Sequence, residues 1–298
     1  MPKQKKQSSR AGVALEVSRA LEQHVGDASR RLAKRGALND EQIHEARKDL
    51  KRARAVLRLL REVIGDRAYQ RENASLRDAA RPLSAARDAK VLFEALTGTL
   101  EAGASAARVS LVRKLRVELE TSRHTAREAL EQSRAIERSA ASLREARTRI
   151  EGLRAAEGRS TQLYNGLERL YRRGRKALAQ ARAEPTPENL HEWRKQVKYL
   201  GQALTVLGGA ANGTRRVIKR AERVAQKLGD DHDLVLLEER ISGVHAGTRN
   251  AHRALTAQIA DKRKKLQSKA LKSGRALYDR KPGQFVKRVR TRVQAQRA

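Results

Sequence analysis

The stretch IHEARKDLKRARAVLRLLR, residues 43–61, combines an apolar helical pattern with a dense run of Lys and Arg. On an α-helix, at about 100° per residue, Leu50, Leu57 and Leu60 gather on one side. The basic residues gather on the opposite side, within about 80° of His44. The pattern predicts a helix that packs through one face and presents cations on the other. This basic face consists of His44, Arg47, Lys48, Lys51, Arg54 and Arg58.

A second stretch, LHEWRKQVKYLGQAL at residues 190–204, repeats the pattern apolar-His-Glu-x-Arg-Lys-x-apolar-Lys. Each copy is followed, at nearly the same separation, by a second related block: LSAARDAKVLFE from Leu83 and LGDDHDLVLLEE from Leu228. Two matched blocks in the same order indicate an internal duplication. The basic set of the second copy is His191, Arg194, Lys195 and Lys198, and the later blocks add Arg87 and His232.

The charge balance of the chain points to a polyanionic partner. The 298 residues include 67 Lys plus Arg against 34 Asp plus Glu, a net charge of +33. Such an excess repels itself in a compact fold, so we expect nucleic acid, an anionic membrane surface or a non-nucleic polyanion to neutralise it. The absence of Cys excludes disulfides and is typical of a reducing cytoplasm. No signal-peptide core or apolar run of the ~18–20 residues that span a bilayer is found, so no membrane association is expected.

Apolar residues recur at helical spacing along the chain, and no run alternates as a strand does. We therefore predict an all-α fold of two pseudo-symmetric helical bundles that arose by duplication. The expected organisation is a disordered basic tail at 1–10, a domain at 11–280 with halves of about 11–150 and 151–280, and a basic C-terminal tail at 281–298. Helices are expected near 11–34, 40–65, 69–81, 83–97, 104–157 with a break near 136–142, 161–182, 188–207, 213–228, 231–243 and 245–279.

The segment DDHD, residues 230–233, raises the alternative of a metal-dependent phosphohydrolase. A metal site needs three or more converging ligands, and no further His-Asp pair stands at a supporting spacing. There is also no HExxH motif and no Walker A loop. A turn is the favoured interpretation, in which Gly229 ends one helix and Asp230 or Asp231 caps the next. We expect no catalytic activity, no metal and no cofactor.

Aromatic residues make up only 3% of the chain, which disfavours a single-stranded nucleic-acid site that stacks bases. Trp193 falls on the apolar side of its helix and is expected in the core. Tyr164, Tyr171 and Tyr199 are the only plausible stacking platforms. Sequence-nonspecific binding of nucleic acid through its phosphate backbone, with the basic tails as contacts, remains the alternative function.

The blocks at 43–54, 190–200 and 228–237, with RLYRRGRKAL at 169–178, resemble the CHAD family, the conserved-histidine α-helical domain. The resemblance spans roughly residues 12–280. It implies two helical bundles related by a pseudo-twofold with a basic cleft or pore between them, and non-catalytic binding of inorganic polyphosphate. The chain looks like a stand-alone member, since we find no strand-borne Glu-x-Glu-x-Lys motif of a CYTH domain. The resemblance also implies association with polyphosphate granules, and the Ala- and Arg-rich composition suits a cytoplasmic protein of a GC-rich bacterium.

The resemblance also assigns the binding residues. The second copy departs from the pattern, because Gly201 and Gln202 stand where the first has Arg54 and Ala55, so we expect that half to bind less strongly. Glu45 and Glu192 fall at the flank of the two basic faces and are not expected to neutralise them. The candidate polyphosphate-binding residues are His44, Arg47, Lys48, Lys51, Arg54, Arg58, Arg87, Arg172, Arg175, Lys176, His191, Arg194, Lys195, Lys198 and His232.

Overall fold

A computed structural model of the chain describes residues 2–33, 38–83, 106–153, 160–208, 212–244 and 248–296. Every regular element in these ranges is an α-helix, which confirms the predicted all-α class. The helices are α1 (Pro2–Leu32), α2 (Asp40–Ile64), α3 (Asp66–Ala80), α5 (Ala106–Gln132), α6 (Ala135–Glu151), α7 (Ser160–Ala183), α8 (Pro187–Gly208), α9 (Asn212–Ser242), α10 (Arg249–Leu277) and α11 (Pro282–Ala295).

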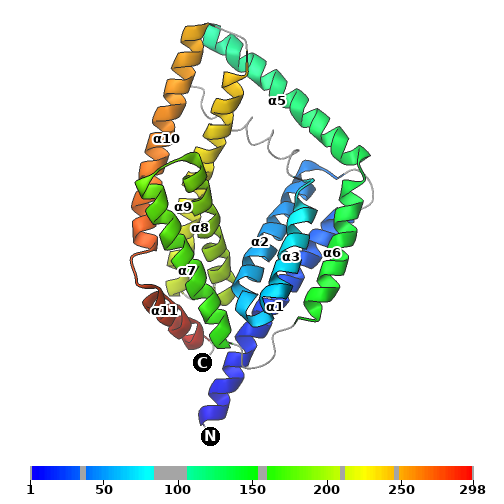
Figure 1. The fold of residues 1–298 in the computed structure, drawn as a ribbon, viewed down its shortest axis with the longest axis vertical. Coiled ribbons are helices and arrows are strands. Elements are labelled where there is room, and N and C mark those ends of the chain that lie inside the picture. Colours follow the sequence, from blue (N-terminus) through cyan, green and yellow to red (C-terminus); the bar gives the residue numbers. More distant parts are fainter. Residues whose placement is uncertain are drawn as a thin grey trace.

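The helices form two groups that lie side by side (Figure 1). In the first group α1 packs on α2 and α6, and α3 packs on the same two helices. In the second, α8 packs between α7 and α9, α9 packs on α10, and α11 crosses the lower end of the group. The groups meet because α2 contacts both α7 and α8, while α5 runs across the top from α6 to α10. The duplication inferred from the sequence stays a prediction.

The helix that carries the first motif, α2, begins at a well-defined cap. The Asn39 side chain accepts a hydrogen bond from the backbone N–H of Gln42, and the Gln42 side chain accepts one from the backbone N–H of Asn39. This capping box satisfies donors that the first turn leaves without helical partners. The helix ends at Gly65, whose φ of 83° lies in a region that favours glycine. The cap fixes the residue at which α2 begins.

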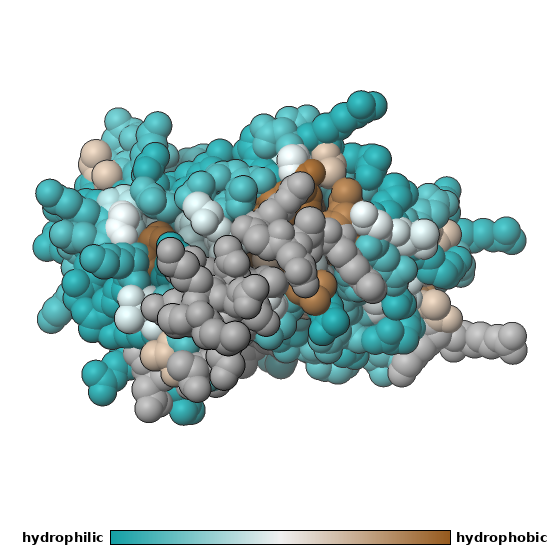
Figure 2. Space-filling model, turned by 90° about the horizontal axis from the view of Figure 1, so that it is seen from below, coloured by the Kyte–Doolittle hydropathy of each residue, from teal (hydrophilic) through white to brown (hydrophobic). Residues whose placement is uncertain are grey.

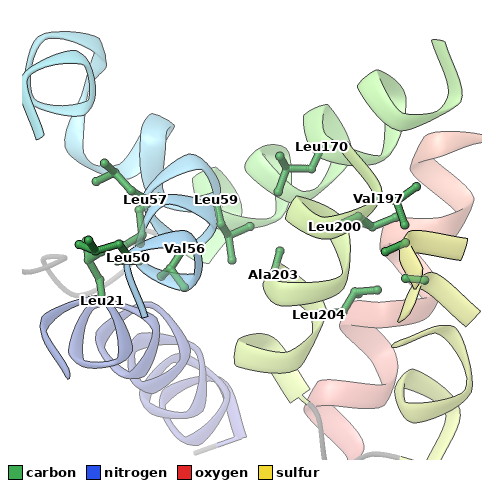
Figure 3. Close-up of a cluster of buried hydrophobic side chains, with 14 of the residues drawn as sticks. Leu21, Leu50, Val56, Leu57, Leu59, Leu170, Val197, Leu200, Ala203 and Leu204 are labelled. Carbon is green, nitrogen blue, oxygen red and sulfur yellow. The ribbon is translucent and has the colours of Figure 1, made fainter. Parts of the chain in front are cut away.

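The apolar face of α2 forms the core of the molecule and joins the two groups. Leu50 and Leu57 are fully buried against the first group, whereas Leu59 points towards the second, where Leu170 and Ala203 lie (Figure 3). The approach is closest at Gly166 of α7, where a Cβ atom would overlap the backbone carbonyl of Leu59. Glycine is therefore needed at this position for α7 to reach α2.

A second, smaller core lies at the other end of the molecule. Leu111, Leu115 and Leu119 of α5 are buried together with residues from the C-terminal half of α9 and the N-terminal half of α10. The other residues of this core are Val112, Leu234, Leu237, Ile241, Val244, Leu255 and Ile259. This core fixes α5 on the upper ends of α9 and α10.

Three boundaries differ from the sequence expectations. Residues 2–10, expected as a disordered tail, continue helix α1. The expected tail 281–298 contains α11, because Phe285, Val289 and Val293 fall on one helical face and are buried against the fold. The expected turn at Gly229 is absent, and α9 runs unbroken from Asn212 to Ser242. The expected helix near 83–97 lies outside the described residues.

Candidate polyanion-binding site

The first basic set lies along α2, and several of its members also hold the fold together. Arg47 donates to the backbone carbonyl of Leu83, which ties α2 to the turn after α3. Arg54 donates from Nε to Asn73 Oδ1 over 3.2 Å, and burial, followed by the neighbouring charge of Arg58, lowers the pKa of Arg54. Lys48, Lys51 and the half-exposed His44 lie nearer the start of the helix and face solvent.

The glutamates beside the motif histidines are more involved than expected. Lys48 Nζ lies 2.8 Å from Glu45 Oε1, and Lys195 makes the equivalent ion pair with Glu192 in the second copy. The expectation that these carboxylates do not neutralise the basic faces is therefore wrong for Lys48 and Lys195. The pairs are exposed and join residues three apart on one helix, so each is weak and easily opened by a competing anion.

The second set brings together two motifs that are far apart in the sequence. The rings of His191 on α8 and His232 on α9 lie 4.5 Å apart, centroid to centroid, and are tilted by 48°. Burial lowers the pKa of His191 to about 4, with the charges of His232, Lys195 and Arg194 acting in the same direction. The Nδ1 atom of His191 is buried and has no hydrogen-bond partner among the described residues.

Arg194 lies between these histidine-bearing helices. Its guanidinium rests on Gly229, where a Cβ atom would come within 3.0 Å of Nη2. The sequence suggested that Gly229 ends a helix, but α9 continues through it. Because Gly229 has no side chain, Arg194 of α8 can pack against α9 at this position. Burial lowers the pKa of Arg194, and the carboxylates of Asp233 and Asp230 oppose that shift. The Arg194 Nε is buried without a hydrogen-bond partner in the described part of the chain.

Lys198 lies one turn further along α8. The residue is exposed to solvent, yet desolvation by the surrounding protein, followed by the charge of Arg194, lowers its pKa to about 8. His191, Arg194, Lys195, Lys198 and His232 thus form one concentrated group of cationic side chains, hereafter the α8–α9 basic cluster.

The two sets come closest where α2 meets α8. The guanidinium of Arg58 lies over the ring of Tyr199, 4.1 Å from its centroid. A cation held on an aromatic face is partly desolvated and fixed in orientation. This contact joins the last member of the basic face of α2 to α8.

The remaining predicted site residues are not brought to this cluster. Arg87 lies outside the described residues. Arg172 pairs with Glu168 of its own helix, with 2.6 Å between Nη2 and Oε1. Arg175 and Lys176 are exposed on α7, and within the described ranges no recorded contact joins them to the cluster.

The aromatic residues argue against base stacking. Trp193 is fully buried, as predicted, and Tyr164 and Tyr171 are 5% and 0% exposed, so neither can act as a platform. Tyr199 retains partial exposure, but Arg58 covers one face of its ring.

In the DDHD segment, Asp231 is a structural residue. Its carboxylate is 1% exposed and accepts hydrogen bonds from Arg263 Nε at 3.3 Å and Gln267 Nε2 at 2.9 Å, both on α10. Asp230 accepts a bond from Gln226. Among the described residues, no three His, Asp or Glu side chains converge as metal ligands.

A cavity of about 560 Å³ lies between the start of α2 and α5, and none of the predicted site residues lines it. Arg127 in its wall pairs with Asp40 at 2.7 Å, and Arg123 approaches the same carboxylate at 3.6 Å. Its charges are balanced internally, so it does not compete with the cluster as an anion site.

No helix in the described ranges has an apolar stretch of the length needed to cross a bilayer.

A family model described as the CHAD domain matches residues 13–242 of the sequence. The chain belongs to the CHAD domain family. This CHAD domain is similar in structure to PptA from Streptomyces chartreusis, with a TM-score of 0.61 and 14% identity over 90% of this chain and 99% of that one. It is equally similar to the CHAD domain from the plant Ricinus communis, with a TM-score of 0.61 and 18% identity over 88% and 91% of the two chains. At these identities the likeness shows the fold alone, and the comparison with curated proteins found no match.

Some features of this CHAD domain could not be read from its sequence. Gly229 and Arg194 are 35 positions apart, and only the packing of α8 on α9 shows that one makes room for the other. The bracing of Asp231 by Arg263 likewise depends on the contact between α9 and α10. The stacking of Arg58 on Tyr199 joins the two groups and has no signal in either motif.

Proposed function

We propose that the protein binds inorganic polyphosphate without cleaving it, with the α8–α9 basic cluster as the primary contact and the basic face of α2 extending it. The observation that carries this proposal is the concentration of cationic side chains around Arg194, where burial and like charge depress the pKa values of His191 and Lys198. A bound polyanion would remove that electrostatic cost. Membership of the CHAD family supports the same ligand.

The chemistry of the cluster suits a linear chain of phosphates. Arg194 offers a planar fork of N–H donors to phosphate oxygens, and Lys195 and Lys198 offer mobile point charges. The buried, unpartnered Nδ1 of His191 and Nε of Arg194 are further groups that a phosphate oxygen or a water beside it would satisfy. The scarcity of exposed aromatics gives a nucleobase nothing to stack on. These points favour polyphosphate over single-stranded nucleic acid.

The second half of the duplicated pattern is the stronger candidate for initial binding. On α2, Arg47 and Arg54 already donate to Leu83 and Asn73, so part of their hydrogen-bonding capacity is used by the fold. On α8, the cations are opposed chiefly by Asp230, Asp233 and Glu192. We therefore infer the reverse of the sequence expectation that the second copy binds less strongly.

The decisive experiment is a titration of long-chain polyphosphate at physiological salt, with duplex DNA and single-stranded RNA as competitors at equal phosphate concentration. The polymer is recovered and sized afterwards. We expect tight binding, no displacement by either nucleic acid, and unchanged chain length. The variant Arg194→Gln/Lys195→Gln should lose at least tenfold in affinity, whereas Arg138→Gln/Arg144→Gln, which removes the same charge from α6, should lose far less.

Other outcomes would select the alternatives. Equal displacement by duplex DNA would favour a general polyanion-binding protein that contacts nucleic-acid backbones. A shortened polymer would favour a phosphohydrolase. If the α8 variant binds as the wild type does, the cluster is not the site. Association with polyphosphate granules in the cytoplasm is part of the same proposal, and fluorescence imaging of the tagged wild type and α8 variant would test it.

A further inference from the structure

The C-terminal helix α11 is built to hold cations at the surface. Phe285, Val286, Val289 and Val293 are each less than 10% exposed and pack α11 against the second group. Pro282 stands in the first turn, where its fixed φ suits a helix start. The other positions are rich in Lys and Arg, so the packing of the apolar face directs a basic face outwards.

Four arginines lie on segments that the packing of α11 on α9 brings together, and the charges of three of them act on the fourth, Arg292: Arg288 and Arg292 of α11, Arg280 of the connection from α10, and Arg216 near the start of α9. We call them the C-terminal arginine cluster. Arg288 and Arg292 are one turn apart and share a face. Arg280 is fixed in the connection because its backbone N–H donates to the buried Tyr171 hydroxyl over 3.2 Å. Arg220 of α9 donates to the carbonyl of Ala276 over 2.6 Å, which joins α9 to the end of α10 near these residues.

Carboxylates offset little of this charge. Among the residues that the structure describes, none forms an ion pair with Arg216, Arg288 or Arg292. Arg280 has only Asp279, at 3.9 Å. Burial lowers the pKa of Arg292, and the charges of Arg288, Arg280 and Arg216 lower it further. The fold thus holds like charges together, at an electrostatic cost that a bound anion would relieve.

The C-terminal arginine cluster is separated from the α8–α9 basic cluster by the length of α8. His191 and Arg194 lie at the start of that helix, whereas its last residue, Gly208, faces Val293 of α11, whose Cγ2 would lie 2.8 Å from a Cβ atom at that glycine. The seventeen-residue separation between His191 and Gly208 corresponds to about 25 Å at 1.5 Å per residue. The two clusters therefore cannot act on one small anion.

The surroundings of the C-terminal arginine cluster suit a phosphate polymer more than a nucleobase or a lipid. The nearby aromatic residues, Tyr171, Tyr278 and Phe285, are at most 5% exposed and stack on each other inside the fold. Seen from below, most of the described surface of this end of the molecule is hydrophilic, and its apolar atoms gather mainly near the middle of the face (Figure 2). Among the residues described at this end, guanidinium groups are exposed, whereas no aromatic side chain is.

We propose that the C-terminal arginine cluster is a second, independent binding site for inorganic polyphosphate. The choice of ligand rests on the function proposed above, whereas the existence of an anion site rests on the four arginines. With two sites on one chain, a single molecule holds two segments of a long polymer or bridges two polymers. The protein then condenses polyphosphate as well as binding it, because bivalent attachment raises the effective concentration of each second contact.

The test counts sites with linear tetraphosphate, which is too short to reach from one cluster to the other. Isothermal titration is carried out on the wild type, on Arg216→Gln/Arg288→Gln/Arg292→Gln, on Arg194→Gln/Lys198→Gln, and on a control, Arg138→Gln/Arg144→Gln/Arg147→Gln, with the same loss of charge on α6. Circular dichroism confirms that each variant is helical. Light scattering with long-chain polyphosphate then measures bridging.

We expect the wild type and the α6 control to bind two tetraphosphates, and each cluster variant to bind one, with affinity at the lost site reduced at least tenfold. Bridging of long chains should disappear in the arginine-cluster variant although it still binds polymer. One site in the wild type that the α8 variant abolishes, or two sites in the arginine-cluster variant, would overturn the proposal and leave the main function standing. A single site that only the arginine-cluster variant abolishes would instead overturn the α8–α9 site. If duplex DNA displaces tetraphosphate from the arginine cluster alone, that cluster is a nucleic-acid surface and the proposal is wrong.

Discussion

His191 of α8 faces His232 of α9, with ring centroids 4.5 Å apart, so that the two histidine-bearing motifs of the second half share one surface. The contact places a titratable pair among Arg194, Lys195 and Lys198. Charge at this surface therefore depends on pH and on whether an anion is bound. The first two predictions follow from that dependence.

The free protein should lose stability as the pH falls from about 6.5 to 4. The pKa of His191 is about 4 in the folded protein against 6.5 for an unperturbed histidine, so the unfolded state binds more protons across this window. Thermal unfolding followed by circular dichroism should show the loss, and His191→Asn should reduce it. The matched control is His124→Asn, since the His124 side chain is 77% exposed. If both substitutions change the acid-induced loss of stability equally, His191 is not its source.

Polyphosphate affinity should rise over the same fall in pH. A bound polyanion favours the protonated histidine, so binding takes up protons where His191 is neutral in the free protein. Calorimetry in buffers of different ionisation enthalpy measures this uptake directly. The internal phosphates of a long chain stay ionised throughout. If His191→Asn takes up as many protons as the wild type, His191 does not lie at the binding surface.

At alkaline pH, polyphosphate affinity should decrease as the pH rises through about 8. Lys198 has a pKa of about 8 in the free protein because of desolvation and the charge of Arg194, so it is losing its proton in this range. The variant Lys198→Arg keeps the cation charged and should flatten the alkaline limb of the affinity profile. Lys176→Arg, a change of the same kind on an exposed lysine of α7, should leave the limb unchanged.

Asp231→Ala should destabilise the protein by about 3 kcal/mol and leave polyphosphate affinity unaltered at temperatures where the variant is folded. The substitution removes the buried carboxylate that accepts from Arg263 and Gln267, but Arg263 keeps its 2.9 Å ion pair with Glu238, so the cost falls at the low end of that for breaking a buried pair. Denaturant unfolding measures the first effect and calorimetry the second. Asp230→Ala, one position earlier, should change stability by less than about 0.5 kcal/mol. Loss of binding in folded Asp231→Ala would instead place this carboxylate at the site.

Gly166→Ala should weaken the packing of the two helical groups and destabilise the protein by about 1–3 kcal/mol. A Cβ atom there overlaps the Leu59 carbonyl oxygen, and backbone cannot move as a flexible side chain does. Because α2 and α7 would separate, polyphosphate binding across both groups should weaken as well. Gly283→Ala is the control, since nothing lies within 4 Å of a Cβ atom at that position. Equal stability of the two variants in denaturant unfolding would contradict this role of Gly166.

The amino-acid sequence by itself determined the helical class, the apolar and basic faces of α2 and α8, and the excess of charge that calls for a polyanion. These follow from local periodicity and composition, which need no knowledge of packing. Trp193 could be placed in the core for the same reason.

Only the tertiary structure decided which distant residues the apolar and basic helix faces contact. Gly229 carries the local signal of a helix end, but the contact between α8 and α9 uses its missing side chain to seat Arg194, and the helix continues. The sequence 281–298 has the composition of a basic tail, yet Phe285 and Val289 find an apolar surface that only the folded second group provides. Local propensity sets what each segment can form, whereas the burial of side chains against distant segments selects which of those forms is stable.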